Sequence, residues 1–511
     1  MTKRIIRDIP LNRVEGDLEI RIELENNRIV DAWSSGTMFR GFENLLVGRG
    51  ALDGLVITPR ICGICSTTHL MAAAKALDHI AGVRLPDNAT RLRNVTLMVE
   101  HCQSDVRQSV LMFLPDFTAA VYATHPLYAE AARRYAPLAG GRCIDVVRQT
   151  KTLLEIIAIL GGQWPHSSFM VPGGVTYIPP LAELNQCRHI LKHYRQWYEQ
   201  RVLGCSLERW QAVQSAADLD AWLNEDSARR DGDVGFFLRF ARAAELHRLG
   251  QGHGHFLSYG SLELPNETAV VNPGGGKQLV DAGFVSRDGQ TQSFDQAQVA
   301  EHVASSWYAD YQGGRHPFDG ETDPHATGAD GKKYSWSKAP RYGGQPAETG
   351  PLAERIVGGN PLFCDLLRHD GANLVNRQLA RLTRPATLLP AMEIWLEEMI
   401  AHLDQPYYEP VPPIQDGRGF GLIEAARGAL GHWVEIRDGR IARYQIVTPT
   451  AWNGSPRDDQ GVRGPWEEAL IGTTVADIDN PVEAGHIVRS FDPCLVCTVH
   501  VIGTERRSLR C

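Results

Sequence analysis

The sequence lacks the features that mark membrane, secreted, nucleic-acid-binding and disordered proteins. It has no run of about 18 apolar residues, so we expect no membrane-spanning helix. Residues 1–8 lack the apolar segment of a secretory signal. Basic residues are not in surplus: 52 Lys and Arg against 60 Asp and Glu give a net charge of −8, which argues against nucleic-acid binding. With 49 Gly and 29 Pro in 511 residues, the composition is that of a globular chain.

The chain shows helical patterns with β segments between and around them. Alternating apolar and charged residues predict a strand over 18–24, followed by a turn at Asn26-Asn27 and a second strand. An Asp438-Gly439 turn predicts a hairpin over 428–447. Helical patterns begin near residue 60 and continue at intervals to residue 403. They cover 60–77, 94–114 (stopped by Pro115), 143–160, 181–202, 234–249 and 351–403.

We find no Pro- or Ser-rich linker that would divide the chain into independent domains. We therefore predict an α+β fold in which residues 1–511 form one large helix-rich domain, with a central helical bundle and peripheral β-sheets. Residues 252–349 are richer in Gly, Asp, Ser and Thr and predict a peripheral region of strands and loops within that domain.

Four of the ten cysteines form two C-x-x-C pairs, Cys62 with Cys65 and Cys494 with Cys497. Four thiolates are enough for an all-sulfur metal site. Structural zinc ribbons bring their pairs together within about 15–20 residues, whereas these pairs lie near opposite ends of the chain. A zinc or iron–sulfur site is therefore possible but is the second choice. The other cysteines are scattered, and we interpret all but Cys511 as small buried hydrophobic residues.

The residues around both pairs resemble a known family. Residues 60–69 (RICGICSTTH) and 492–500 (DPCLVCTVH) resemble the two nickel-binding motifs of the nickel–iron hydrogenase large subunit. Shorter segments along the whole chain share the resemblance: 13–17, 39–43, 161–166, 338–342, 426–430 and 449–453. One C-x-x-C alone is weak evidence, but two in this order with these flanks are strong.

The resemblance implies a nickel–iron centre whose iron carries CO and cyanide. By position, Cys62 and Cys494 would be terminal nickel ligands, and Cys65 and Cys497 would bridge nickel and iron. Thiolates are soft donors suited to nickel. Such a centre splits H2 heterolytically into hydride and proton.

The resemblance also implies residues that surround the metals. Arg427 would overhang them and donate to a cyanide, Asp105 and Asp492 would hold that arginine, and Thr450 would hydrogen-bond the other cyanide. The proton acceptor is either Arg427 or the Cys494 thiolate, because a guanidinium is a very poor base. The family usually has Pro in place of Ala426.

Three further residues carry implied roles. Glu15 would take the proton from a metal-bound cysteine, although a carboxylate at this place is also typical of a plain strand edge. Glu43 and His500 would bind a magnesium ion, for which a histidine ligand is unusual. His69 would give a supporting hydrogen bond.

Ile64 and Phe113 indicate a branch of the family. Both are bulkier than the Val and Leu of many members beside the gas route, and they resemble the uptake and hydrogen-sensing members; ordinary core packing is the alternative. A regulatory H2 sensor that signals to a kinase with the same site is therefore an alternative to the enzyme. The remote alternative is a zinc-stapled structural protein, which would not require Arg427, Glu15 or Glu43.

No third cysteine cluster of iron–sulfur type is present, so electrons have no visible exit within the chain. The resemblance implies an iron–sulfur small subunit, a higher oligomer of heterodimers, nickel chaperones and a maturation protease that removes a tail, here residues 501–511. Because the closest resemblance is to members without an export signal, we expect a cytoplasmic location, with membrane association through partners.

Overall fold

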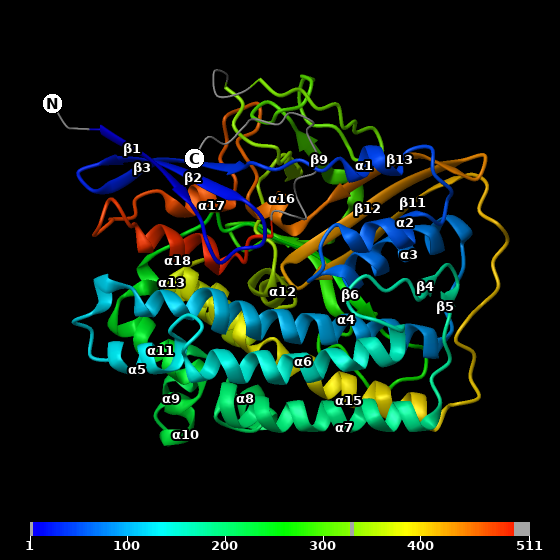
Figure 1. Ribbon diagram of the computed structural model, residues 1–511, viewed down its shortest axis with the longest axis horizontal. Coiled ribbons are helices and arrows are strands. Elements are labelled where there is room, and N and C mark those ends of the chain that lie inside the picture. The colour runs from blue at the N-terminus through cyan, green and yellow to red at the C-terminus, as the bar shows by residue number, and fades with distance from the viewer. Residues whose placement is uncertain (1–3, 328–331, 495–511) are drawn as a thin grey trace, which may run out of the picture.

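The computed structural model describes residues 4–327 and 332–494, and all lengths and contacts below refer to them (Figure 1). The helices are α1 (Phe42–Leu46), α2 (Gly54–Ile57), α3 (Ser66–Ala81), α4 (Asp87–Arg107), α5 (Tyr128–Tyr135), α6 (Gly141–Gly161), α7 (Leu181–Tyr198), α8 (Leu207–Gln211), α9 (Ala216–Leu223), α10 (Ser227–Asp231), α11 (Asp233–Ala243), α12 (Pro351–Val357), α13 (Pro361–Asp370), α14 (Leu374–Thr383), α15 (Pro385–Ala401), α16 (Pro449–Asn453), α17 (Pro465–Leu470) and α18 (Val482–Ser490).

The strands form five small antiparallel sheets, ordered β1-β2-β3, β4-β5, β6-β7-β8, β10-β9 and β11-β12-β13. Their bounds are β1 (Arg4–Pro10), β2 (Leu18–Glu25), β3 (Arg28–Gly36), β4 (Met170–Val171), β5 (Gly174–Val175), β6 (Phe256–Glu263), β7 (Gln278–Val285), β8 (Thr291–Gln292), β9 (Val299–His302), β10 (Ala339–Tyr342), β11 (Gly417–Ala425), β12 (Gly428–Arg437) and β13 (Arg440–Val447).

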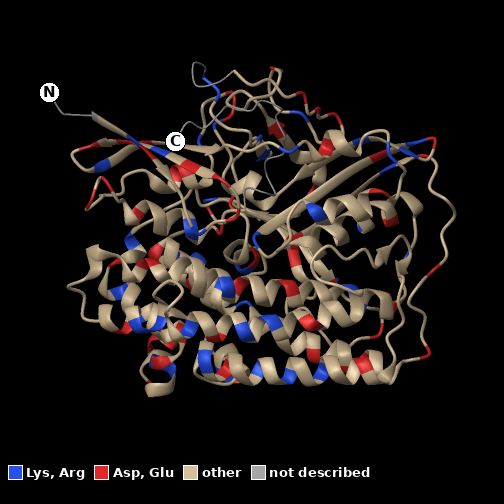
Figure 2. Ribbon diagram, viewed as in Figure 1, with Lys and Arg blue, Asp and Glu red and all other residues tan. Residues whose placement is uncertain are grey.

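Four long helices, α4, α6, α7 and α15, form the bundle across the lower half of Figure 1, and the sheets lie above it. Helix α4 packs against α6 and α15, and α7 packs against the same two helices from the other side. On the outer helices, Lys and Arg are interspersed with Asp and Glu (Figure 2). One ion pair of these charges, Arg195 with Glu393, joins α7 to α15. The predicted α+β architecture with a central helical bundle is confirmed.

Helix α4 is enclosed on all sides, because every residue from Asn88 to Val106 is buried. Its interior includes charged side chains, among them Arg91, Glu100 and Asp105. Buried charges are stable only when they are paired or hydrogen-bonded, so this helix carries a polar network through the protein core. That network leads to the site described below.

The predicted elements are confirmed in type and differ at their ends. The strands around Asn26-Asn27 and the hairpin over 428–447 are present. The helix expected from residue 94 begins at Asp87. Its first turns are buried all round, so they lack the solvent-facing polar side that would identify them as helix from the sequence. Near its end, the α-helix changes to a π-turn at Gln108–Phe113, and Pro115 lies in the 3₁₀ turn that follows. Strand β11 and helices α8 to α10 were not predicted.

The described helices include none that combines the length and the apolar character needed to cross a bilayer.

Candidate metal centre

Three of the four predicted cysteine ligands meet in the protein interior. The sulfur atoms of Cys62, Cys65 and Cys494 all lie within 4.8 Å of one another, and Cys62 Sγ and Cys494 Sγ are 3.5 Å apart. Two thiolates on one tetrahedral metal at 2.3 Å lie about 3.8 Å apart, so this spacing suits a shared metal. We call these three residues the cysteine cluster. Cys497 and His500 lie outside the described residues.

The remaining cysteines give no second cluster in the described part of the chain. Cys102, Cys143 and Cys187 are buried, as predicted, whereas Cys205 and Cys364 are only half-buried. Burial raises the pKa of the Cys102 thiol well above its ordinary value, and the negative charge of Asp105 adds to the effect. A thiol held neutral in this way is inert.

Helix α3 fixes the first cysteine pair. Cys65 directly precedes the helix, so its sulfur lies near the N-terminal end, where the helix dipole favours negative charge. Glu100 of α4 accepts hydrogen bonds from the backbone N–H groups of Thr67, at 2.8 Å, and Thr68, at 2.9 Å. Burial raises the pKa of Glu100 to about 7, although these hydrogen bonds oppose the rise. The carboxyl group therefore anchors the first turn of α3 to the bundle.

The second pair enters the cluster from α18. The backbone N–H of Cys494 donates to Thr450 Oγ1 at 2.9 Å. The N–H of Glu15 donates to the carbonyl of Pro493 at 3.3 Å, which joins the N-terminal segment to the residue before Cys494. Segments from both ends of the sequence thus hold Cys494 in place.

Arg427 lies beside the cluster in the tight connection between β11 and β12. Its Nε is 3.2 Å from Asp492 Oδ2, and the side chain is 4% exposed. Burial would lower the pKa of Arg427, but the charges of Asp492 and of the cluster cysteines raise it well above its ordinary value. Its Nη1 has no hydrogen-bond partner among the described residues. A buried donor of this kind is ready for an acceptor at the site.

Asp492 also contacts a second arginine, and the pairing continues into the core. Arg381 donates to Asp492 Oδ2 at 3.2 Å and lies 3.7 Å from Asp105 Oδ1. Arg384 pairs with both oxygens of Asp105, at 2.7 and 2.8 Å, and donates to Glu354 at 2.6 Å. Signs alternate along the whole series, which we call the ion chain. Its members, in order, are Arg427, Asp492, Arg381, Asp105, Arg384 and Glu354.

The ion chain shows how Asp105 is connected to Arg427. Asp492 holds Arg427 directly, but in the described part of the chain Asp105 makes no ion pair with Arg427. Arg381 and Arg384 lie between them, and both donate to the carbonyl of Ala426, at 3.1 and 2.8 Å. Asp105 therefore acts on Arg427 indirectly, through the two arginines that fix the preceding peptide.

Glu15 lies at the edge of the cluster, half-buried. Burial raises its pKa above the ordinary value; Arg427 opposes the rise, and the charges of Cys62 and Asp492 add to it. A carboxylate with a raised pKa is a better proton acceptor than an exposed one.

Glu43 belongs to a separate buried group of polar side chains. Glu43 Oε1 accepts from the N–H of Ile446 at 2.8 Å, and Oε2 is 3.6 Å from Lys338 Nζ. The same Nζ is 3.4 Å from Glu301 and 2.7 Å from Gln445. Burial raises the pKa of Glu301 to about 7, Lys338 opposes the rise and Glu43 adds to it. These oxygens are the donor type that magnesium prefers.

Several of these residues were not predicted from the sequence. Arg381, Arg384 and Glu354 of the ion chain were missed, as were Glu100 and the polar partners of Glu43. A signal was present for the arginines: Arg377, Arg381 and Arg384 recur at helical spacing in an otherwise apolar segment. Charges repeated on the same helix face within such a segment indicate buried partners.

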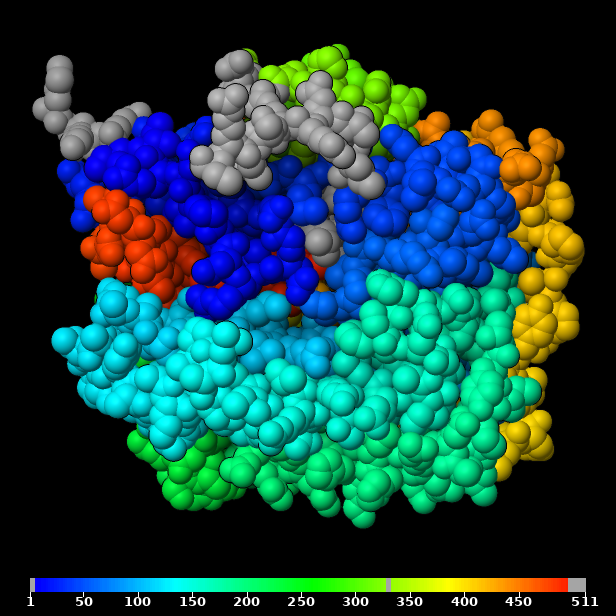
Figure 3. Space-filling model, viewed as in Figure 1, coloured from blue at the N-terminus to red at the C-terminus, as the bar shows by residue number. Residues whose placement is uncertain are grey.

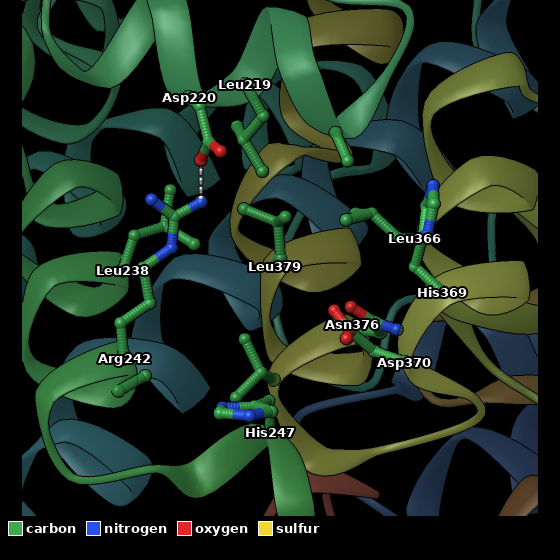
Figure 4. Close-up of a pocket in the computed structure, with 13 residues that line it drawn as sticks. Leu219, Asp220, Leu238, Arg242, His247, Leu366, His369, Asp370, Asn376 and Leu379 are labelled. Atoms are coloured by element: carbon green, nitrogen blue, oxygen red, sulfur yellow. Dashed lines mark hydrogen bonds and ion pairs between the residues drawn. The ribbon is translucent and has the colours of Figure 1, made fainter.

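A cavity of about 490 Å³ lies elsewhere, between α9, α11, α13 and α14 (Figure 4). Its walls combine leucines, such as Leu238 and Leu379, with an ion pair between Asp220 and Arg242. None of the predicted site residues lines it.

Comparison with known proteins gives consistent matches over nearly the whole chain. The family model described as "Nickel-dependent hydrogenase" matches residues 40–113 and 233–500. The periplasmic [NiFeSe] hydrogenase large subunit of Desulfomicrobium baculatum is 32% identical, over 97% of this chain and 95% of the relative. The uptake hydrogenase large subunit of Rhizobium leguminosarum bv. viciae is 27% identical, over 99% and 96%.

A solved structure agrees with these matches. The Ni-Fe-Se hydrogenase from D. vulgaris Hildenborough, in its reduced state, superposes with a TM-score of 0.81 at 31% identity. The superposition covers 98% of this chain and 100% of that one.

Proposed function

The chain belongs to the nickel-dependent hydrogenase family as a large subunit, and from this premise we propose which of its residues hold the metals and move the proton. It is the catalytic subunit of a nickel–iron hydrogenase, its substrate is H2, and its family implies a small-subunit partner. We base the assignment of residues to the metal centre on one observation, the buried cysteine cluster.

The donor set fits the metal centre of the family. Cys62 and Cys494 would bind nickel alone, and Cys65 would bridge nickel and iron together with Cys497, which lies outside the described residues. When bound, such a centre would supply the Lewis-acid and redox chemistry by which H2 yields two protons and two electrons. The close approach of Cys62 and Cys494, at 3.5 Å, supports a shared metal.

The surrounding donors fit an iron with CO and cyanide ligands. Arg427 Nη1 has no hydrogen-bond partner within residues 4–327 and 332–494, which supports a hydrogen bond from this arginine to one cyanide. Thr450 uses its oxygen to accept from the N–H of Cys494, so its hydroxyl hydrogen is available to the second cyanide.

The Cys494 thiolate would accept the two protons of H2 one at a time and pass each of them to Glu15. Arg427 is the weaker candidate for the base, because the surrounding negative charges stabilise its protonated form and raise its pKa. Glu15 is bonded through its backbone to the residue before Cys494 and has a raised pKa. The ion chain then keeps Arg427 charged and in position.

Magnesium would occupy the group around Glu43. Glu43, Glu301 and Gln445 supply oxygens there, and the predicted ligand His500 lies outside the described residues. Lys338 lies among these oxygens, at 2.7 to 3.6 Å. It balances part of their negative charge.

The small subunit would dock on an apolar patch made of Leu45, Val47, Leu52 and Val56, which are 46 to 53% exposed. These side chains lie on α1, α2 and the loops beside them, just before Cys62 in the sequence. Residues 40–80 form the lighter blue surface at the upper right of Figure 3. Exposed apolar side chains on the elements that precede the first cysteine pair in the sequence suit a permanent partner that collects electrons.

The remaining proposals concern the cellular setting. We propose a cytoplasmic location, with membrane association through partner proteins, and an oligomer of heterodimers. We also propose maturation by nickel chaperones and by a protease that removes residues 501–511. The D. baculatum relative is periplasmic by name, so cell fractionation is the test of location. The sensor alternative would use the same residues, and the relatives described above are hydrogenases, one of them of the uptake type.

Metal content and intact mass of the purified chain test the assignment together. Nickel and iron in equal amounts, with a mass ending at His500, are expected. Nickel and iron with the tail retained would contradict only the processing step. One zinc per chain without nickel would contradict the metal centre and favour the structural alternative.

A further inference from the structure

The segment that carries Glu15 leaves its sheet to reach the cysteine cluster. Residues 11–17, which we call the Glu15 loop, join β1 to β2 and can be followed as the blue connection between these strands in Figure 1. At its base, the N–H of Leu11 donates to the carbonyl of Leu18 at 2.9 Å. Near its tip, the N–H of Glu15 donates to the carbonyl of Pro493 at 3.3 Å. A backbone hydrogen bond of this length is a weak hold for a group that must meet a reacting centre.

A buried carboxylate, Asp116, gives the Glu15 loop a stronger anchor. Asp116 lies in the 3₁₀ turn Leu114–Thr118, which follows the end of helix α4. Arg13 of the loop donates to Asp116 Oδ1, and its Nη1 donates to the carbonyl of Met112 at 2.9 Å. The guanidinium therefore ties the loop to the helical bundle just before Glu15.

Arg489 of α18 binds the other oxygen of the same carboxylate. Its Nη1 donates to Asp116 Oδ2 at 2.7 Å. Its Nε and Nη2 donate to the carbonyl and to the side-chain oxygen of Asn12, at 3.1 and 2.8 Å. A Cβ at Gly485 would lie 2.6 Å from Nη1, so the guanidinium occupies the space that a side chain there would need. Because Arg489 precedes Cys494 on the same segment, Asp116 joins the two parts of the chain that meet at the cluster.

Asp116 binds both arginines as an anion. Burial would raise the pKa of Asp116, but its positively charged neighbours, above all Arg489, lower it below the ordinary value. Hydrogen bonds between charged groups are about twice as strong as those between neutral ones. Arg13 also has a φ of 55°, in the left-handed region that a residue with a side chain adopts only at a cost. The pairing with Asp116 offsets that cost, which indicates that the position of this loop matters.

We propose that Asp116 is a positioning residue for proton transfer, which fixes the Glu15 loop against the segment that carries Cys494. Through its two arginines, Asp116 sets the reach of the Glu15 carboxyl group. A displacement of about 1 Å at a reacting group can cost about 100-fold in rate. This proposal rests on the proposed role of Glu15, because it concerns the geometry of that step.

Hydrogen–deuterium exchange of the full chain tests the hold on the loop without any activity. The variant Arg13→Met keeps the apolar stem of the side chain and removes its donors, and the Arg13 side chain is 26% exposed, so little burial is lost. We expect the backbone amides of residues 11–18 to exchange at least several-fold faster than in the parent. Arg142→Met is the matched control, because Arg142 is also a partly buried arginine paired with a buried aspartate, Asp233. Equal exchange of the loop in Arg13→Met and in the parent would overturn the proposal.

A double-mutant cycle in the holoenzyme separates positioning from general stability. We expect Arg13→Met to lower kcat for H2 oxidation by up to about 100-fold, with KM for H2 and nickel content unchanged. In a Glu15→Gln background the same substitution should have no further effect, because the group that it positions is gone. Arg142→Met should change kcat in neither background. An unchanged kcat in Arg13→Met, or losses that multiply in the double variant, would overturn the proposal.

The variant Asp116→Asn tests the carboxylate itself. The amide keeps one acceptor oxygen and loses the charge, so loop exchange and kcat should change in the same direction as in Arg13→Met, whereas Asp233→Asn should leave both as in the parent. Unchanged loop exchange in Asp116→Asn would overturn the role of the carboxylate, and if this variant does not fold, the Arg13→Met cycle decides. If Glu15→Gln alone keeps the kcat of the parent, the proposed proton route fails, while the exchange measurement still decides whether Asp116 holds the loop.

Discussion

At the scale of single residues, Arg427 shows how a charge is kept at a buried site. Its partner Asp492 is shared with Arg381, and the alternation continues to Glu354. An isolated charge in the core would be expensive to bury. In the ion chain each charge has a neighbour of opposite sign. The guanidinium of Arg427 can therefore stay charged while it lies beside the cysteine cluster.

The variant Arg427→Lys keeps the charge and removes the planar set of donors. We expect H2 oxidation to fall by about 100-fold or more, because one positioned donor at a reacting centre is worth about this factor. Nickel content should stay unchanged. Arg463→Lys is the control, since Arg463 is also ion-paired, to Asp31 and Glu468. Activity near that of the parent would mean that positive charge alone suffices.

The variant Glu15→Gln tests the route of the proton. Gln has nearly the same shape but cannot accept the proton, so kcat for H2 oxidation should fall by about 100-fold or more. Nickel content and the spectrum of the metal centre should not change. Glu19→Gln, a partly exposed position on β2, serves as the control. If turnover survives in Glu15→Gln, the proton leaves by another group.

Glu467 offers a test of buried charge away from the site. Its Oε1 accepts from the N–H of Ser34 at 2.8 Å and from the hydroxyl of Tyr334 at 2.9 Å, and burial raises its pKa to about 7 despite these bonds. The folded state therefore keeps this proton at a pH where the unfolded state, with its ordinary value near 4.5, has lost it. The free energy of unfolding must therefore fall as the pH rises from about 4.5, the pKa of Glu467 in the unfolded chain, to about 7, its pKa in the folded chain.

The variant Glu467→Gln keeps both accepted hydrogen bonds on its carbonyl oxygen and removes the titration. Between pH 4.5 and 7 the parent should lose up to about 3 kcal/mol of unfolding free energy relative to the variant. The difference in Tm between the two, measured across this range, should widen as the pH rises. A constant difference would show that Glu467 titrates alike in the folded and unfolded chain.

At the scale of elements, strand β11 explains one failure of sequence-based prediction. Gly417, Gly419 and Gly421 lower its strand propensity. They are needed because α3 lies directly on the strand: a Cβ at Gly421 would be 1.9 Å from the carbonyl oxygen of Ala72, and one at Gly419 would be 2.3 Å from that of Ala76. The reason for these glycines lies in a helix more than 300 residues earlier.

The variant Gly421→Ala should disturb this contact. We expect a loss of about 1 to 3 kcal/mol of unfolding free energy, which is typical of overpacking. Nickel content should fall as well, because α3 directly follows Cys65. Thermal unfolding and metal analysis measure both effects. Gly141→Ala is the control, since a Cβ there meets nothing within 4 Å. Equal behaviour of the two variants would mean that α3 can shift without cost.

Other elements could be predicted because their signals are local. The turns at Asn26-Asn27 and Asp438-Gly439 carry positive φ angles that these residues adopt readily. Helix α4 was the opposite case: it is buried on every side, so its apolar and polar residues follow no surface pattern. Its start at Asp87 depends on the elements that surround it.

At the scale of the whole molecule, the cysteine motifs and their flanks could be predicted, but their polar support could not. Cys62 and Cys494 carry recognisable neighbours, so their meeting was expected from the sequence. Arg384 was missed because its partners, Asp105 and Glu354, come from two other helices. Partners brought together only by the tertiary fold leave no spacing rule in the sequence.

The apolar patch makes a prediction for the assembled enzyme. The variant Leu52→Asp should reduce copurification of the small subunit several-fold, because a charge at an apolar interface must be desolvated without a partner. The chain itself should keep its Tm, since Leu52 is 53% exposed. Ile178→Asp is the control, being 65% exposed and outside the patch. Full copurification of Leu52→Asp would place the partner elsewhere.

The burial of the ion chain has a consequence for ionic strength. Dissolved salt screens charges that it can approach, over about 8 Å at physiological concentration. No member of the ion chain is more than 7% exposed, so dissolved ions cannot reach it. The contribution of the ion chain to the electric field at the cysteine cluster should therefore change little between dilute and concentrated buffer. If turnover depends on salt, we expect the cause to lie in steps that involve exposed charges, such as electron transfer between molecules, and not in the pairing that holds Arg427.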